Sequence, residues 1–316
     1  MRKLLPSLLP VCLLLLLTVD AARAQETLDF TRTRDVIYGR KDGLALTLDV
    51  IAPRAKANGL GLIFVVSRGW RSRPEDIRPG MYAPFFQRGY TVFAVVHGTQ
   101  PRFTVPEIVP DVHRAVRFIR YHAKDYHIDP DRLGITGASA GGHLSLMLAT
   151  AGTAGDAKAK DAVQRVSSRV QAVACFVPPT DFLNWGRQGA VLDAKHIQDK
   201  RFKAAIDFHI FDTHERIFQR VSDDTKVHEI LRDISPISHV SRDDPPTLII
   251  HGDKDKLVPL QQSQRMVAKL KEVGVPANLI VKKGCGHFWI TILKDTETLA
   301  DWFDRYLKNE QRRAAE

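Results

Sequence analysis

The chain has 316 residues, with 46 Lys and Arg against 36 Asp and Glu, a formal net charge of +10, and 44% hydrophobic residues. The apolar fraction is too high for a disordered chain, and Gly and Pro are too sparse for a fibrous one. Its three cysteines are too few for a disulfide scaffold or a multi-cysteine zinc module. The length fits one large α/β domain or two small ones, and the positive charge raises nucleic acid, anionic polymers and membrane surfaces as partners.

The first 24 residues have the features of a secretory signal peptide. Two basic residues precede an apolar stretch over residues 4–19, and residues 22–24 form the small-x-small pattern of a signal-peptidase site. The stretch is short for a membrane span of about 20 residues, although an uncleaved anchor is the alternative. We expect cleavage before Gln25, a secreted or periplasmic product, and no stable membrane association. Removal takes away three positive charges and one negative, which leaves +8.

Apolar runs and helical periodicity alternate along the rest of the chain. Residues 36–38 and 44–51 are typical of two antiparallel strands around a turn at 41–43. The further strands expected are 62–66, 91–96, 132–136, 170–177, 247–251 and 277–282, and the expected helices are 81–87, 105–126, 139–150, 260–273 and 294–307. This alternation predicts an α/β fold with a mostly parallel central sheet and helices on both faces.

Residues 182–236 interrupt the alternation with charged, weakly amphipathic sequence. We interpret them as a helical cap inserted in a single domain that spans residues 25–316. An insertion here should lie above the carboxyl ends of the strands, where such sheets bind ligands. It lacks the long apolar face expected of a lid for triglyceride, and its four histidines have no spacing typical of metal ligands.

Two cysteines, Cys175 and Cys285, remain in the predicted mature chain. Export places them in an oxidising compartment, where disulfides form and persist. We expect free thiols, because the sequence places the two cysteines at the ends of strands that lie apart in the sheet.

The pattern G-x-S-x-G occupies residues 137–141, between an expected strand and an expected helix. A serine on such a sharp turn has its hydroxyl clear of the sheet, and flanking glycines prevent backbone clashes. The helix N-terminus also favours the negative charge that develops there. We therefore predict that Ser139 is a nucleophile. The alternative is a serine helix cap before a glycine-rich packing surface.

A nucleophilic serine needs a base and a group that orients the base. His287 is the only histidine after residue 255, and it ends a glycine-rich loop that follows the last expected strand. We predict that His287 is the base. His143 lies one helical turn past Ser139, and we expect it to be a buried support rather than the base.

The acid should come from the loop after the strand at 247–251. Asp253 and Asp255 both lie there. Asp253 is nearer the strand end, where aspartates often cap backbone amides, whereas Asp255 lies deeper in the loop and can reach toward His287. Asp181, which follows the preceding strand, is a third candidate.

Acyl transfer also needs backbone amides directed at the oxygen that gains charge, each worth about 10²–10³ in rate. We expect Ala140, directly after the nucleophile, to supply one N–H group. The other should lie at residues 66–70, which read Val-Ser-Arg-Gly-Trp. The Arg68 side chain is expected either at the mouth of the site, facing an anionic or sugar-bearing substrate, or on the outer surface.

Three motifs together resemble the α/β-hydrolase superfamily. They are the turn at residues 137–141, the pattern H-G-x-x-D-x-x-V-P at residues 251–259, and the Gly-His pair that ends at His287. Within the superfamily, the chain resembles the bacterial esterase/lipase group that includes acetylxylan and feruloyl esterases, related to the catalytic domain of prolyl oligopeptidases. The resemblance covers residues 35–309.

The resemblance implies an α/β-hydrolase fold and assigns the acid, because the acid of that family is the second aspartate of the loop pattern. It therefore implies a triad of Ser139, His287 and Asp255.

The resemblance also places Arg68, Gly69 and Ala140 on the positions that donate oxyanion amides. Ser67 and Arg68 stand where that family usually has two glycines, and this is the departure of the chain from the family pattern.

These features predict a secreted serine hydrolase that cleaves carboxylic esters, with acetyl-type esters, such as those on polysaccharide, as preferred substrates. The chemistry requires no metal and no organic cofactor. We expect no binding to nucleic acid, because the sequence contains no aromatic-interleaved basic patch or recognition module. The alternatives are a catalytically weak binding protein on the same scaffold and a serine peptidase of the prolyl oligopeptidase type. Such peptidases usually carry a β-propeller before this domain, and only about ten residues separate Gln25 from the first expected strand.

Overall fold

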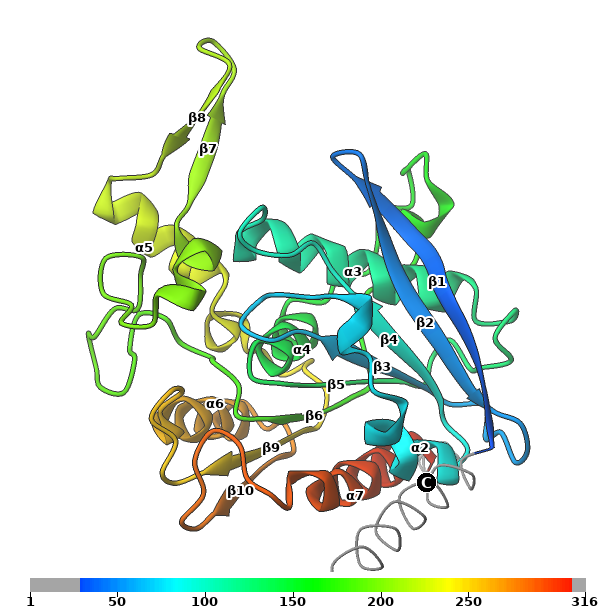
Figure 1. Ribbon diagram of the computed structural model, residues 1–316. Helices are drawn as coiled ribbons and strands as arrows, with labels where there is room; N and C mark the ends of the chain where they lie inside the picture. The colour runs from blue at the N-terminus through cyan, green and yellow to red at the C-terminus, as the bar shows by residue number, and fades with distance from the viewer. Residues whose placement is uncertain (1–28, 309–316) are drawn as a thin grey trace, which may run out of the picture.

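The computed structural model describes residues 29–308, so the predicted signal peptide at residues 1–24 lies outside the described residues. The centre of the fold is an eight-stranded sheet in the order β1-β2-β4-β3-β5-β6-β9-β10 (Figure 1). The strands are β1 (Phe30–Lys41), β2 (Leu44–Pro53), β3 (Gly61–Val66), β4 (Thr91–Val96), β5 (Leu133–Ala138), β6 (Ala172–Phe176), β9 (Thr247–Gly252) and β10 (Ala277–Lys282). Strand β2 runs antiparallel to both of its neighbours, β1 and β4, and the other neighbouring strands are parallel.

The central strands are the apolar runs of the sequence. Strands β4 and β9 are buried along their whole length, as parallel strands covered on both faces should be. At the edge of the sheet, β1 is longer than the predicted strand at 36–38. In its first half only Phe30 and Arg32 are partly buried and the other residues are exposed and polar, so a search for apolar runs detects only residues 36–38, in its second half.

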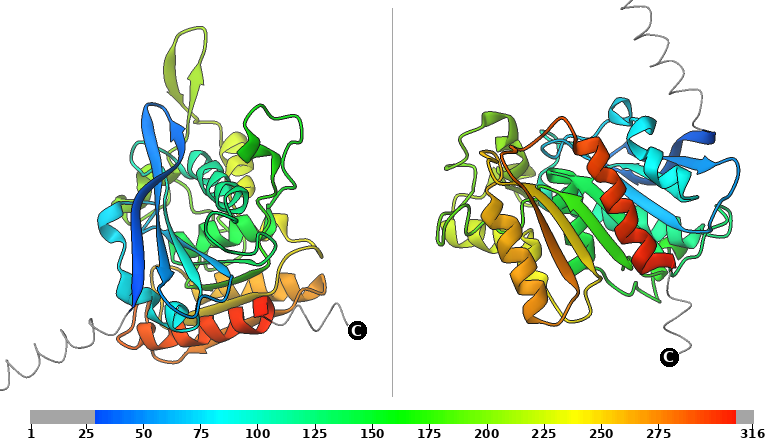
Figure 2. Two further views of the ribbon diagram at one scale, coloured as in Figure 1. Left: turned by 90° about the vertical axis from the view of Figure 1, so that its right-hand side faces the viewer. Right: turned by 90° about the horizontal axis from the view of Figure 1, so that it is seen from below.

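Helices cover both faces of the sheet. The helices α3 (Val105–Tyr121), α4 (Ala140–Thr150) and α6 (Leu260–Glu272) share one apolar core, and α2 (Ala83–Gln87) and α7 (Ile292–Phe303) share the other. Figure 2 shows α7 lying across the face of the sheet that is seen from below. This arrangement confirms the predicted α/β class with helices on both faces.

The helix predicted at residues 105–126 ends earlier, at Tyr121. Residues beyond it form successive turns, and the chain reaches His127 with a φ of +53°. The helix has already ended before this residue, because its C-cap His122, with a φ of −94° and a ψ of +15°, is no longer α-helical. The apolar periodicity continues through the turns because Ala123 and Ile128 are still buried against the same core.

The insertion at residues 182–236 is less helical than expected. It contains the 3₁₀ segment η4 (Lys200–Ile206), the helix α5 (Asp224–Asp233), and a hairpin of β7 (His209–Asp212) and β8 (Ile217–Arg220) that stands out from the body of the molecule (Figure 1). Each hairpin strand has four residues, a length at which alternation is hard to detect. The insertion contacts the loops that follow β3 and β4, since Gln100 donates to the carbonyl of Arg201 at 2.7 Å.

Cys175 and Cys285 are both free thiols, as predicted. Strand β9 separates the strand that holds Cys175 from β10, which precedes Cys285. Between residues 29 and 308, no helix combines the length and the apolar character that crossing a membrane requires.

Candidate active site

Ser139 joins the end of β5 to the first residue of α4, at a strained turn. Its φ of +54° and ψ of −118° define a backbone conformation that residues other than glycine rarely adopt. Its N–H group donates to the carbonyl of Phe176 at 2.9 Å, which ties the turn to the neighbouring strand β6. The tertiary structure therefore holds a conformation that presents the serine side chain at the carboxyl edge of the sheet.

The glycines of the G-x-S-x-G pattern are required by close backbone contacts. A Cβ atom on Gly137 would lie 2.5 Å from the carbonyl carbon of Gly141. A Cβ atom on Gly141 would lie 2.6 Å from the carbonyl oxygen of Val65 in β3. Helix α4 can therefore begin this close to β3 and β5 only when both positions lack a side chain.

The structure brings the three residues of the predicted triad together. Ser139 Oγ lies 2.9 Å from His287 Nε2, and His287 Nδ1 lies 2.7 Å from Asp255 Oδ2. The three side chains come from the turns and loops that follow β5, β9 and β10. One imidazole thus lies between a hydroxyl and a carboxylate, the geometry in which a base can accept a proton and a carboxylate can orient it.

The side chain of Asp255 is fully buried, and every hydrogen bond to it favours its ionised form. Its Oδ1 accepts the N–H groups of Leu257 at 2.8 Å and Val258 at 2.9 Å, while its Oδ2 faces His287 and also lies 3.2 Å from His251 Nε2. Burial favours the neutral acid, but the hydrogen bonds from His251 and His287 outweigh it and hold the pKa of Asp255 well below its usual range. The carboxylate therefore stays charged at neutral pH.

His251 supports the Asp255 carboxylate. The H-G-x-x-D pattern contains this histidine but does not indicate its role. Its Nε2 faces two oxygens, Asp255 Oδ2 and the carbonyl of Val258 at 2.9 Å, so this nitrogen carries the proton. Its Nδ1 then accepts a hydrogen bond from Ser263 Oγ at 2.7 Å. The histidine of the H-G-x-x-D pattern thus donates a second hydrogen bond to the Asp255 carboxylate.

The other acid candidates contact different groups. Asp253 Oδ1 accepts the N–H group of Gly284 at 2.7 Å and so links the two loops. Asp181 is buried and forms an ion pair with Arg265 at 3.1 Å. Neither hydrogen-bonds to His287, so the geometry favours Asp255.

The loop after β3 supports Gly69 but not Arg68 as an oxyanion donor. The N–H group of Arg68 donates to the carbonyl of Arg71 at 2.8 Å. The expectation for Arg68 is therefore wrong, because its amide hydrogen is already engaged, and its side chain is exposed. Within residues 29–308, the N–H groups of Gly69 and Ala140 donate a hydrogen bond to no acceptor.

His143 connects three parts of the site, as a buried support. Its Nε2 donates to the carbonyl of Ile234 at 2.7 Å, so its Nδ1 accepts the indole N–H of Trp70 at 3.2 Å. Burial lowers the pKa of His143 to about 4, which keeps the ring neutral at pH 7. Trp70 directly follows Gly69, and no pattern in the sequence indicates its role.

No group of three or more His, Cys, Asp or Glu side chains in the described part of the chain has an arrangement that could hold a metal ion.

A family model described as BD-FAE matches residues 48–270. The chain belongs to the BD-FAE family. The family lies among the α/β-hydrolase esterases, which confirms the resemblance read from the three motifs.

Individual relatives agree with the BD-FAE assignment. Over 185 residues, the chain is 32% identical to the probable carboxylic ester hydrolase LipM of Mycobacterium tuberculosis, covering 58% of this chain and 38% of LipM. It is 29% identical over 252 residues to the esterase LipQ of the same organism, covering 77% of this chain and 53% of LipQ. A solved structure, the truncated form of a carbohydrate esterase from gut microbiota, superposes with a TM-score of 0.71 at 25% identity, covering 90% of this chain and 99% of that one. The chain thus spans about half the length or less of these two curated relatives.

Proposed function

We propose that this protein hydrolyses carboxylic esters with Ser139 as nucleophile, His287 as general base and acid, and Asp255 as the group that orients the imidazole. The observation that carries the proposal is the continuous line of hydrogen bonds from Asp255 through His287 to Ser139, at 2.7 and 2.9 Å. The names of the curated relatives, both described as ester hydrolases, support the same reaction.

The reaction divides into two halves. Ser139 Oγ attacks the ester carbonyl carbon while His287 Nε2 takes its proton, and the carbonyl oxygen becomes an oxyanion facing the N–H groups of Gly69 and Ala140. The tetrahedral intermediate collapses to an acyl-enzyme, and the alcohol leaves with the proton from His287. Water then gives a proton to His287 and attacks the acyl-enzyme, and the second tetrahedral intermediate releases the carboxylic acid as His287 returns the proton to Ser139 Oγ.

Short acyl groups are the preferred substrates in this proposal. The ring of Phe202, in the insertion, lies so close to Gly69 that a Cβ atom there would be 2.2 Å from it. This ring fills space beside a proposed oxyanion donor and so favours a small acyl group, such as acetyl. A carbohydrate as the alcohol part is supported by the similarity to the carbohydrate esterase of gut microbiota.

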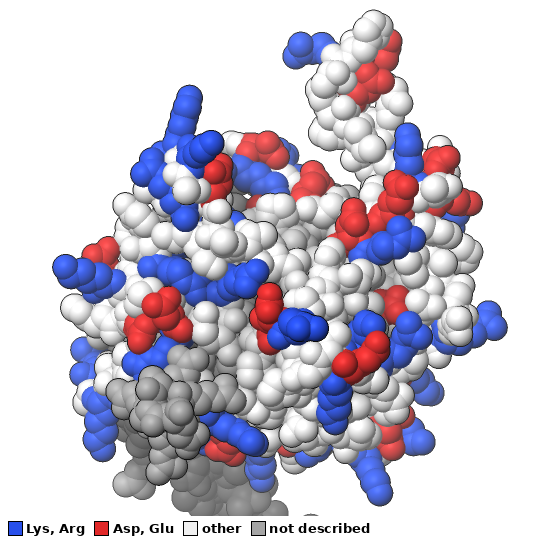
Figure 3. All heavy atoms as spheres, turned by 180° about the vertical axis from the view of Figure 1, so that it is seen from behind, with Lys and Arg blue, Asp and Glu red and all other residues white. Residues whose placement is uncertain are grey.

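Secretion is also part of the proposal, supported by the sequence of residues 1–24. We also propose that nucleic acid is not a partner, and the charges on one face of the molecule agree with this. On the face shown in Figure 3, Lys and Arg side chains are intermingled with Asp and Glu rather than gathered in one basic patch. N-terminal sequencing of the protein recovered from outside the cytoplasm tests the cleavage before Gln25.

The test of the function compares substrates on protein that begins at Gln25. We expect hydrolysis of 4-nitrophenyl acetate to be much faster than that of the palmitate ester, and activity on acetylated xylan to exceed that on feruloyl esters. Turnover of proline peptides alone would overturn the esterase proposal in favour of a peptidase. Binding of the esters without turnover would favour a binding protein on this scaffold.

A further inference from the structure

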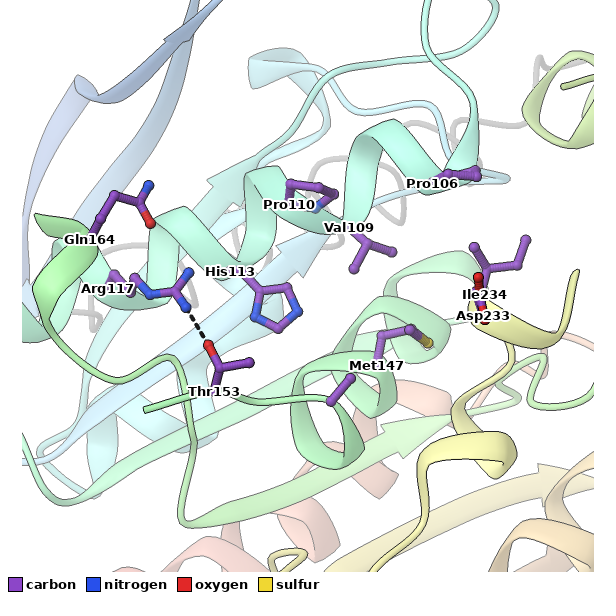
Figure 4. A pocket seen from close by; sticks show the side chains of 11 residues that line it. Pro106, Val109, Pro110, His113, Arg117, Met147, Thr153, Gln164, Asp233 and Ile234 are labelled. Carbon is purple, nitrogen blue, oxygen red and sulfur yellow. Dashed lines mark hydrogen bonds between the residues drawn. The ribbon is translucent and has the colours of Figure 1, made fainter. Parts of the chain in front are cut away.

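A pocket lies between α3 and α4, apart from the candidate active site (Figure 4). Its volume is about 420 Å³, which falls within the range of small-molecule sites, roughly 300–1,000 Å³. Met147 in its wall is eight residues beyond Ser139, a separation of about 12 Å along a helix. None of the triad residues lines it.

One end of the pocket is polar and positively charged. Four polar side chains lie at this end, those of His113, Arg117, Thr153 and Gln164 (Figure 4). The Arg117 guanidinium donates to Thr153 Oγ1 and to the carbonyl of Val166, and no carboxylate of residues 29–308 pairs with it. A partly desolvated cation that contacts only neutral groups favours the binding of an anion, because charge-assisted hydrogen bonds are stronger than hydrogen bonds between neutral groups.

His113 offers a further polar group at the same end. Its Nδ1 lies 2.9 Å from Ser168 Oγ, and its ring points into the pocket (Figure 4). Nε2 makes no hydrogen bond to the described residues, so it can donate to a ligand when the Ser168 hydroxyl donates to Nδ1. Burial lowers the pKa of His113 to about 4, so the ring is neutral at pH 7 and Arg117 supplies the charge.

The rest of the wall is apolar and elongated. Val109, Met147 and Ile234 line it, together with two prolines of α3. From the first of these prolines to Arg117, α3 advances eleven residues, about 16 Å. Asp233 lies at the end opposite Arg117 (Figure 4), where its charge disfavours a second carboxylate on the ligand.

We propose that this pocket binds an elongated monocarboxylate, with its carboxylate on Arg117 and its apolar body along Val109 and Met147. The binding does not depend on the proposed function, whose preferred substrates release shorter acids.

Titration calorimetry of the Ser139→Ala variant of the chain with octanoate tests this proposal, because no turnover is needed. We expect saturable binding with one site. The neutral octanamide should bind at least tenfold more weakly, since it loses the charge-assisted contact. Octanedioate should also bind more weakly than octanoate, because its second carboxylate meets Asp233.

Two further substitutions locate the binding. Arg117→Gln should weaken octanoate binding about tenfold or more, and Ala151→Phe, which fills the pocket from α4, should abolish it. Arg242→Gln changes an exposed arginine outside the pocket and should leave the affinity unchanged. Thermal unfolding identifies a variant that fails to fold, and the other pocket variant then carries the test. Absence of octanoate binding, equal binding of octanamide, or unchanged affinity in a folded pocket variant would overturn the proposal.

Discussion

The indole N–H of Trp70 donates to Nδ1 of the fully buried His143 at 3.2 Å. Trp70 follows the proposed donor Gly69, and His143 lies one turn along α4 from Ser139. The loop that carries one proposed oxyanion donor is thus hydrogen-bonded to the helix that carries the other proposed donor, Ala140. The catalytic geometry in this account depends on that link, although neither side chain contacts the Ser139 hydroxyl.

Replacing Trp70 with Phe should therefore lower kcat/KM by about tenfold, because small displacements of a catalytic group have large effects on rate. It should also cost about 1–3 kcal/mol of stability, since the buried His143 Nδ1 loses its donor. Ester kinetics and denaturant unfolding measure the two effects. The matched control is Trp302→Phe, which removes an indole hydrogen bond to Pro246 on the opposite face of the sheet. Equal losses of activity in both variants would show that Trp70 acts only through stability.

Asp255→Asn should reduce kcat about 10³–10⁴-fold with little change in KM, because an amide cannot hold the imidazole in the correct tautomer. The comparison is Asp253→Asn, two residues away, whose carboxylate bonds only to the Gly284 N–H group within this site. We expect that variant to keep most of its activity. If Asp253→Asn were the damaging change, the assignment of the acid would be wrong.

His97, His113 and His143 predict a loss of stability in mild acid. Burial lowers the pKa of each ring to about 4, whereas a histidine in the unfolded chain has a pKa near 6.5. The unfolded state therefore binds more protons between these values, and stability falls as the pH drops from about 6.5 to 4. The slope is about 1.4 kcal/mol per pH unit for each ring.

Denaturant unfolding at pH 7, 6 and 5 measures this slope. His143→Gln should reduce it by roughly one proton, after allowance for the lower stability at pH 7. His214→Gln, at an exposed histidine of the hairpin, should leave it unchanged. A slope that is the same in all three proteins would contradict the titration of His143.

Phe202→Ala tests the proposed preference for short acyl groups. Removal of the ring beside Gly69 opens space near the oxyanion donor, so kcat/KM for the hexanoate ester should rise relative to that for the acetate ester. Phe208→Ala also removes a phenylalanine from the insertion and is the control. An unchanged ratio in Phe202→Ala would mean that other residues limit the acyl length.

The sequence was most informative where its pattern is local. Apolar runs located the central strands, and Ser139 could be predicted because G-x-S-x-G must join a strand to a helix. His287 and Asp255 depended on the chain order and the family pattern, because the distance between them is set by the sheet. The engagement of Arg68 by Arg71 could not be predicted, since that contact is made by main-chain groups whose conformation no side chain reveals.

Other features depend on tertiary contacts alone. Trp70 and His143 lie 73 residues apart in the sequence, and nothing in either segment identifies its partner. The hairpin was missed because its two strands are short and carry apolar side chains that stay exposed, such as Phe218. The pocket beside α3 forms only when segments from four parts of the chain meet, so no sequence pattern points to it.

The central claim is that Ser139 is a nucleophile activated by His287. Its most direct test is intact-protein mass spectrometry after exposure to a 4-nitrophenyl dialkyl phosphate, with peptide mapping of the modified residue. We predict a single added phosphoryl group on Ser139, loss of ester hydrolysis in proportion to labelling, and no labelling of Ser139→Ala or, at the same exposure, of His287→Gln. Labelling at another residue, or full esterase activity in the Ser139→Ala variant, would contradict the account.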